Sequence, residues 1–240
     1  MEFLDSKCGG YALGFNSTSS LIKLGSMYIP PINRVDDWSE VERFVVAARA
    51  ADLITVDTDG LPIATLLPTV WEIEDLEREK FGRIIMHMAR GNQQWRSINS
   101  GTQGLAIFHG TQAYISPTNY ENKLTDHKVV PTWNYQSVHM SGIVEVSEDE
   151  EVLRQIVTDL TARHESPREF PWSVTESDPH YFDLQLKGIV AVILHVTKVE
   201  AKSKISQNKS SGERKRIVED LFSSGIPGEE VIATEMQRYL

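Results

Sequence analysis

The sequence predicts a mainly β protein with added helices, of the α+β class, whose antiparallel strands close into a barrel-like sheet. Strand-like segments follow one another across short turns rather than regular crossover helices, which favours antiparallel pairing. Amphipathic helical segments lie before, between and after the strands, where they can cover a sheet. The 240 residues are 40% hydrophobic and 24% charged, a composition that can bury a sizeable core.

The first 26 residues differ from the rest of the chain. Residues 1–26 are polar and rich in glycine and serine, with neither helical nor strand periodicity, so we expect a flexible extension or an artefact of the start site. They lack the pattern of a secretory signal, and no run approaches the length of a bilayer span. With Cys8 as the only cysteine, we expect a cytoplasmic protein without disulfides, a cysteine metal site or membrane attachment.

The first half of the domain is expected to be one helix followed by strands. Asp36 or Asp37 can cap a helix that runs to about Ala51. A hairpin follows, in which Gly60 takes a positive φ. Strands are expected at about 53–56, 61–67, 68–73, 82–89, 104–109, 112–116, 136–147 and 188–201.

The later segments add helices around the last strands. An amphipathic helix is expected from Asp149 to His164, and a weaker one from Tyr181 to Leu186. The strand Gly188 to Val199 is apolar on both alternating faces, so one face is expected to meet the core and the other a partner subunit. Gly212 to Leu240 is expected to form two helices around a Ser-Ser-Gly-Ile-Pro turn.

Three segments could carry chemistry, and the first follows the strand at 82–89. Ala89, Arg90 and Asn92 lie where the strand turns into a helical start, and such a turn presents backbone N–H groups to an anion such as phosphate. Trp95 could supply a flat surface for a ring system. The alternative is a capped helix start with a structural tryptophan.

The second and third segments offer polar groups beside aromatic rings. Thr132, Trp133, Asn134 and Tyr135 could line a planar ligand, or could form a buried corner of the barrel. The nearby His139 is expected to be a core or interface residue rather than a base. In the third segment, the run Ser206, Gln207 and Asn208 suits a pyrimidine-like edge, with Lys209 as a counter-charge, although alone it is an ordinary loop.

Together these segments resemble the PaiB family, FMN-binding negative transcriptional regulators related to the pyridoxamine 5'-phosphate oxidase-like split barrels. The stretches that carry the resemblance are Met27 to Pro31, Asp59 to Pro62 with Ala64-Thr65, His87 to Asn92 with Gln94-Trp95, Ala113 to Pro117, Val130 to Tyr135 with Val138-His139, and Lys204 to Lys209. Gln93 and Lys209 depart from the family, whose members usually have proline and arginine at these positions.

The resemblance implies an FMN-binding split-barrel domain over residues 27–210, a C-terminal helical appendage over 211–240, and a homodimer that holds FMN in a groove between subunits. Some proteins of this fold bind haem or a deazaflavin instead, and these remain alternatives. The phosphate is expected near Ala89, Arg90, Asn92 and Trp95, and the ring near 132–135 and 206–208. The cofactor-binding residues implied are His87, Met88, Ala89, Arg90, Asn92, Trp95, Thr132, Trp133, Asn134, Tyr135, Ser206, Gln207, Asn208 and Lys209.

Two functions follow from this resemblance, and a third is less favoured. The first is a transcriptional or metabolic regulator that acts through a flavin-bound homodimer. The second is an FMN-dependent oxidoreductase on a small unsaturated substrate; no catalytic constellation or metal-ligand spacing is recognisable, which favours the first. Direct DNA binding by the last two helices is doubtful, because the net charge is −10 and the final helix carries three glutamates against Arg238.

Overall fold

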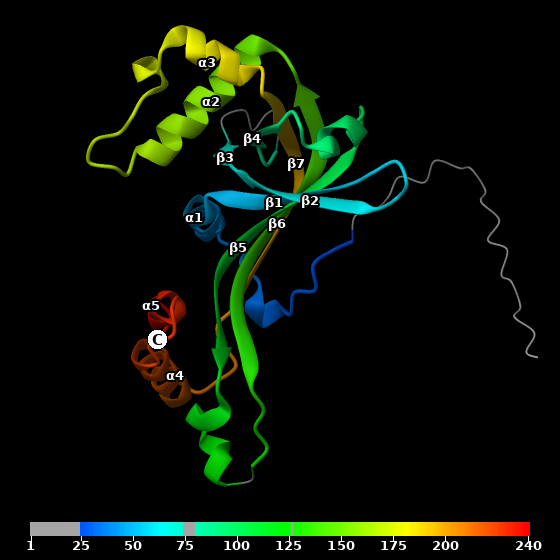
Figure 1. Cartoon of the computed structure of the whole chain (residues 1–240). Coiled ribbons are helices and arrows are strands. Elements are labelled where there is room, and N and C mark those ends of the chain that lie inside the picture. The colour runs from blue at the N-terminus through cyan, green and yellow to red at the C-terminus, as the bar shows by residue number, and fades with distance from the viewer. Residues whose placement is uncertain (1–24, 74–79, 126) are drawn as a thin grey trace, which may run out of the picture.

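The computed structural model describes residues 25–73, 80–125 and 127–240. At its centre is one antiparallel sheet of seven strands in the order β2-β1-β5-β6-β7-β4-β3, with helices packed around it (Figure 1). The strands are β1 Ala50–Val56, β2 Pro62–Pro68, β3 Val70–Glu72, β4 Arg83–Ala89, β5 Gln103–Ile115, β6 Thr132–Ser147 and β7 Ile189–Lys204. The helices are α1 Trp38–Ala48, α2 Glu150–Glu165, α3 Pro179–Leu186, α4 Ser211–Ser223 and α5 Glu229–Gln237. The predicted α+β class with a split barrel is confirmed.

The sheet curls into a barrel because β2 comes back against β4. Gln94, fully buried just after β4, closes this seam. Its side-chain amide donates to the carbonyl of Leu53 at 3.0 Å and to the hydroxyl of Thr55 at 3.1 Å, and its side-chain oxygen accepts from the hydroxyl of Thr65 at 2.6 Å. The closed seam completes a barrel around an apolar core. Residues of this core include Leu53, Met86, Met88, Phe108, Met140 and Leu194.

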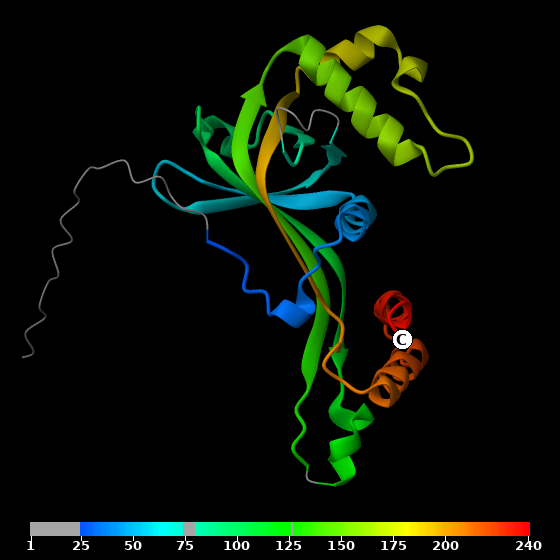
Figure 2. The same ribbon diagram turned by 180° about the vertical axis from the view of Figure 1, so that it is seen from behind.

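Three strands continue past the barrel and form an arm. β5, β6 and β7 are long enough to serve both parts, and α4 and α5 pack against the far part of this ribbon (Figure 1 and Figure 2). The arm has its own apolar cluster, in which Ala113 and Ile115 of β5 meet Ile217, Leu221, Ile232 and Met236 of the two helices. The two predicted C-terminal helices are thus packed onto the sheet.

The outer face of β7 corrects one expectation. The side expected to meet a partner subunit is instead covered by α2 and α3 of the same chain, where Ala191 and Ile193 pack against Ile156, Leu160 and Leu186. The opposite side, which includes Val192 and Leu194, faces the barrel core as expected. A strand buried on both faces needs two apolar layers, and here one chain supplies both.

Several boundaries also differ from expectation. The first helix, expected to reach about Ala51, ends at Ala48, because Arg49 takes a left-handed φ of 59° and the next residues join the ladder with β2. The strands expected at 104–109 and 112–116 are one strand, β5, with a bulge between His109 and Gln112. A bulge shifts the register without ending the pairing, so a single strand spans both expected segments.

Other expected elements are confirmed. Asp37 caps α1 and Asp149 caps α2 by accepting hydrogen bonds from backbone N–H groups of the first turn. Gly60, with φ of 82°, makes the tight turn between β1 and β2. The weak helix at 181–186 is α3. Of the proposed extension over residues 1–26, residues 1–24 lie outside the described residues.

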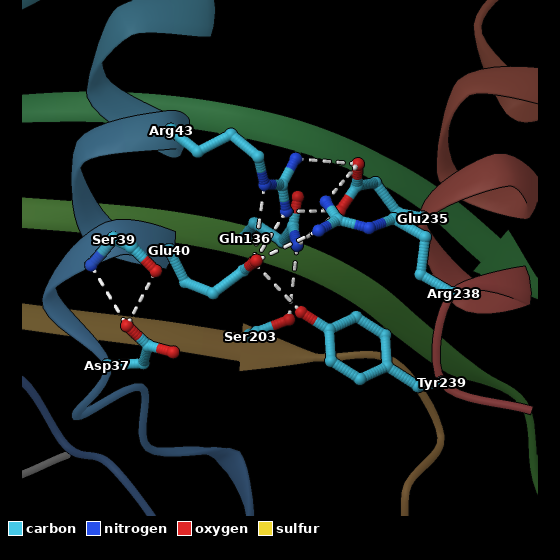
Figure 3. A network of polar contacts seen from close by, with 9 residues as sticks. All are labelled: Asp37, Ser39, Glu40, Arg43, Gln136, Ser203, Glu235, Arg238 and Tyr239. Carbon is cyan, nitrogen blue, oxygen red and sulfur yellow. Dashed lines mark hydrogen bonds and ion pairs between the residues drawn. The ribbon is translucent and has the colours of Figure 1, made fainter.

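A polar network ties the arm back to the barrel (Figure 3). Arg43 on α1 donates to both carboxylate oxygens of Glu235 on α5, at 2.8 and 2.6 Å, and to Glu40 one turn earlier. Glu40 also accepts from Arg238 and from the hydroxyl of Tyr239, each at 2.9 Å. Because bidentate arginine–carboxylate pairs are strong and directional, this network fixes α5 relative to α1.

We expect Gln94→Ala to destabilise the fold by about 2–3 kcal/mol, because it leaves buried seam acceptors unsatisfied and opens a cavity. The neighbouring Gln93→Ala is a matched control, since Gln93 is exposed and, within the described ranges, its side chain donates to the carbonyl of Gly91 alone. Urea unfolding of both variants measures the difference. Equal stabilities would remove the role given to Gln94.

The network of Figure 3 predicts a pH dependence. The hydrogen bond from Arg43 is the main cause that holds the pKa of Glu40 below its usual 4.5. This stabilisation is present above the pKa of the unfolded state and is lost as pH falls through the lower native pKa. Glu40→Gln should therefore be less stable than the parent at pH 7, with a gap in melting temperature that narrows below about pH 4.

Glu42→Gln is the control for this experiment, because Glu42 is exposed on the same helix and forms no ion pair with any described residue. A gap for Glu40→Gln that stays constant from pH 7 to pH 3 would contradict the assignment.

Candidate functional site

The structure divides the predicted site residues into two groups at opposite ends of β7. The barrel-end group is His87, Met88, Ala89, Arg90, Asn92 and Trp95, and the arm group is Thr132 to Tyr135 with Ser206 to Lys209. His87 pairs with Ala191, whereas Tyr135 pairs with Lys204, thirteen residues further along the same strand. That is a path of roughly 40 Å at ~3.3 Å per residue. A single flavin mononucleotide cannot contact both groups of one chain.

In the barrel-end group, Arg90 is held by its own chain. Its guanidinium donates to the carbonyls of Lys187 at 2.9 Å and Ile189 at 3.3 Å, and it forms an ion pair with Glu148. Its backbone N–H donates to the carbonyl of Gly188. A phosphate bound by this guanidinium would have to replace or join Glu148.

Asn92 and Trp95 also have structural partners. The side-chain oxygen of Asn92 accepts from the backbone N–H of Gln94 at 2.9 Å and caps the short 3-10 turn Gln93–Ser97, while its amide donates to Thr65 at 3.0 Å. The indole N–H of Trp95 donates to the carbonyl of Arg90 at 3.0 Å. The capped turn with a structural tryptophan, weighed as the alternative, is therefore present. The exposed rim of the turn is formed by Ala89, Gly91 and Gln93.

His87 and Met88 point to opposite sides of β4. Met88 lies in the barrel core, so its side chain cannot reach a surface groove. His87 lies on the side that α2 and α3 cover, half-buried, and burial lowers the pKa of its imidazole. Its Nδ1 is buried and has no hydrogen-bond partner among the described residues. Both features favour the neutral form of the imidazole.

The arm group is split between the two faces of β6, because neighbouring residues of a strand point in opposite directions. Trp133 and Tyr135 lie on the open face. Asn134 is fully buried on the other face, beneath α5, where its amide donates to the hydroxyl of Ser206 at 2.9 Å and contacts the sulfur of Met236 at 3.5 Å. The amide of Asn134 therefore positions α5 and the 206–209 loop.

The open side of the arm carries an aromatic surface with one lysine, which we call the aromatic face: Tyr28, Tyr114, Trp133, Tyr135 and Lys202. Tyr114 and Trp133 meet edge to face with ring centroids 6.5 Å apart, and each is 48% exposed. The ammonium group of Lys202 donates to the hydroxyl of Tyr135 at 2.5 Å and to the carbonyl of Tyr28 at 3.0 Å. Tyr28, Tyr114 and Lys202 were not among the predicted binding residues, although Tyr28 and Tyr114 lie in stretches that carry the family resemblance. The two-residue spacing of Lys202 and Lys204 on one strand was the available signal for Lys202.

A small cavity of about 260 Å³ at the end of the arm, the arm-tip pocket, collects five of the predicted residues. Thr132, Asn134, Ser206, Asn208 and Lys209 line it, together with Tyr120, Lys128 and Lys204, which the sequence did not single out as binding residues. Gln207 is not in its lining, because its side chain bonds back to the backbone of Ser203 and Ile205. The loop turns at Ser206, which takes a left-handed φ of 63°.

The rest of the described structure gives weaker evidence for a binding site. A larger cavity of about 1220 Å³, between α2 and the strands β3 and β4, is lined by none of the predicted site residues. Within the described ranges, no three histidine, cysteine, aspartate or glutamate side chains are placed to share a metal ion. None of the described helices is both long and apolar enough to cross a bilayer.

The barrel, the arm and the residues gathered at their two ends define a split-barrel protein of the flavin-binding class. Residues 27–198 match the family described as "Putative FMN-binding domain". The chain is 31% identical over 211 residues to the protease synthase and sporulation protein PAI 2 of Bacillus subtilis, covering 88% of this chain and 97% of that protein. The chain therefore belongs to the PaiB family of FMN-binding-domain proteins, and FMN is the cofactor that this assignment specifies.

More distant similarities include a fungal protein and several solved structures. An uncharacterized protein of Aspergillus fumigatus is 28% identical over 197 residues, covering 66% of this chain and 76% of that protein. Among solved structures, the FAD and heme binding protein of Mycobacterium smegmatis aligns with a TM-score of 0.49 at 13% identity, covering 72% of this chain and 73% of that one. HutZ, the heme storage protein of Vibrio cholerae, aligns with a TM-score of 0.42 at 13% identity over 69% and 94%.

If the aromatic face lies beside a bound flavin, its exposed tryptophan should report the binding. We expect Trp133→Phe to remove a larger share of the fluorescence quenching by FMN than Trp38→Phe, because Trp38 packs against Trp71 and Phe81 near α1. Fluorescence titration of both variants with FMN measures this. Equal residual quenching in the two variants would place the flavin elsewhere.

Proposed function

We propose that two copies of this chain bind FMN in a groove that they share, and that the flavin-bound homodimer acts as a cytoplasmic regulator. One observation carries the proposal: the two groups of predicted binding residues lie at opposite ends of β7, roughly 40 Å apart along the strand at ~3.3 Å per residue. A cofactor that contacts both groups needs the barrel end of one chain and the arm of another.

A two-fold dimer meets this requirement without any further element. In an isologous pair, a contact between the barrel end of one chain and the arm of its partner is repeated by symmetry, so two equivalent sites form. The extended arm supports this arrangement, because it projects beyond the barrel (Figure 1). The arm also carries the exposed rings of Tyr114 and Trp133.

The outer face of the sheet formed by β1, β2 and β5 also supports a dimer interface. Ile54 of β1 lies opposite Leu105 of β5, and Leu66 of β2 lies opposite Asp52, all on the side away from the core. Leu66 is 65% exposed, while Ile54 and Leu105 are partly exposed. Neighbouring apolar side chains that remain accessible on a sheet are typical of a surface that another chain covers.

The residues at both ends fit an anionic, planar ligand. The exposed rim of the turn at Ala89, Gly91 and Gln93 can admit the polar end of a ligand, and Trp133 and Tyr135 offer a flat apolar surface for a ring system. Lys202 can donate a charged hydrogen bond to a ring oxygen beside Tyr135. Bound FMN supplies hydride and one-electron redox chemistry there, and the protein groups bind and orient it.

A regulatory role is supported by the relative in Bacillus subtilis, which is named a protease synthase and sporulation protein. We further infer that α4 and α5 do not enter a DNA groove. Ile232 and Met236 of α5 are buried in the arm cluster, and Glu235 is bound by Arg43, so this helix presents acidic and already occupied side chains. Phosphate repulsion opposes the docking of such a helix.

The test begins with the absorption spectrum of the purified protein and a titration of the apo form with FMN. We expect a saturable flavin complex and a dimer by sedimentation. Arg90→Ala should weaken FMN binding by about tenfold while the dimer persists, because a charged donor at the barrel end is lost.

Arg168→Ala is the matched control, since Arg168 is exposed and its ion pair among the described residues is with Glu165 on α2. FMN affinity that is unchanged in Arg90→Ala would remove Arg90 from the site. A monomer that binds FMN at full affinity would overturn the shared groove, and rapid turnover of NADH or NADPH by the flavin complex would replace the regulator with the oxidoreductase.

A further inference from the structure

The arm-tip pocket has a chemistry that the flavin proposal does not use. We infer that it binds a phosphate monoester group, held by Lys204 and Lys209. Its volume of about 260 Å³ is below the ~300–1,000 Å³ of cavities that enclose whole drug-sized ligands. The pocket therefore suits the charged end of a ligand better than the three-ring system expected beside Ser206 to Asn208.

The two lysines are available to an anion. The ammonium group of Lys204 donates to the neutral hydroxyl of Thr132, and that of Lys209 lies 3.5 Å from the centroid of the Tyr120 ring. Among the residues that the structure describes, neither group forms an ion pair. A lysine ammonium binds phosphate as a point charge, and both of these groups are partly removed from solvent, where such an interaction is stronger.

The acid Glu213, which interacts with Lys209, does not neutralise the pocket. Glu213 is buried at the start of α4, where its carboxylate accepts the backbone N–H groups of Glu121 and Ser210, each at 3.1 Å. Burial alone would raise the pKa of Glu213, but these donors and the charge of Lys209 lower it overall. Its charge is thus compensated by its own hydrogen bonds, in a chain whose net charge is −10.

The loop that lines the pocket supplies neutral donors as well. Asn208 is exposed at the rim, and neither its backbone N–H nor its side-chain amide bonds to another described residue. Ser206 takes a left-handed φ just before it, and backbone N–H groups that follow such a residue form concave anion-binding turns. Two ammonium groups with an amide donor make a complete set for a phosphate.

The phosphate could belong to FMN or to a separate phosphorylated small molecule, and the experiment separates these sources. Binding of inorganic phosphate to the full-length protein is measured by calorimetry. We expect Lys204→Gln and Lys209→Gln each to weaken it by about tenfold. Lys198→Gln is the matched control on the same strand, because Lys198 pairs with Glu200 and lies outside the pocket.

The preference for FMN over riboflavin, measured as the ratio of the two binding affinities, is then compared in the same three variants. A preference that falls in Lys204→Gln and Lys209→Gln assigns the pocket to the cofactor's phosphate, which would then lie at the arm and not at the barrel-end rim. A preference that persists while phosphate binding is lost assigns it to a separate ligand. Phosphate affinity equal to that of Lys198→Gln in both pocket variants, with unchanged melting temperatures, overturns the inference. Phosphate binding by a protein that binds no flavin would retain the pocket and reject the proposed function.

Discussion

The architecture depends on the continuous hydrogen-bonded ribbon formed by β5, β6 and β7. These strands contribute to the barrel at one end and to the arm at the other, and their pairing is interrupted only by local shifts of register at His109/Gln112 and Ser141/Gly142. A paired ribbon cannot fold back on itself without losing ladder hydrogen bonds. It therefore holds the barrel-end group and the arm group apart. Because of this separation, a cofactor site that uses both groups requires two chains.

Each part of this ribbon is covered by a different layer of the same chain. The barrel core lies on one side of β7, α2 and α3 cover the other, and α4 and α5 cover the arm. The network that joins Arg43 to Glu235 then fixes the last helix to the first (Figure 3). The proposed contacts use four surfaces that these layers leave open: the rim of the turn at Ala89, Gly91 and Gln93, the outer side of the β1–β2 hairpin, the aromatic face and the arm-tip pocket.

Much of the fold could be predicted because local patterns coincide with the final structure. Asp37, Gly60 and Asp149 signal their cap or turn by residue type, and the alternation in β6 and the apolar run in β7 identify these strands. The left-handed Arg49 could not be predicted, since nothing in the local sequence requires it. The covering of Ala191 and Ile193 by α2 could not be predicted either. An apolar strand face indicates that it is buried, but it does not indicate whether the same chain or a partner covers it.

The site was harder to predict than the fold. A run such as Thr132 to Tyr135 reads as one unit, yet strand geometry sends Asn134 beneath α5 and Trp133 to the open face. Lys202 and Lys204 join Tyr135 and Thr132 only through the register of β6 on β7, which is a tertiary property. Residue types that suit a cofactor were thus visible in the sequence, while the face on which each one lies was not.

The shared groove is tested most directly by mixing two defective chains. One chain carries Arg90→Ala and the other Trp133→Ala, and the two are refolded together so that mixed dimers form. If each site takes its barrel end from one chain and its arm from the other, a mixed dimer has one intact site, and about a quarter of all sites should regain the FMN affinity of the unaltered protein. No recovery above the two separate variants would contradict the account.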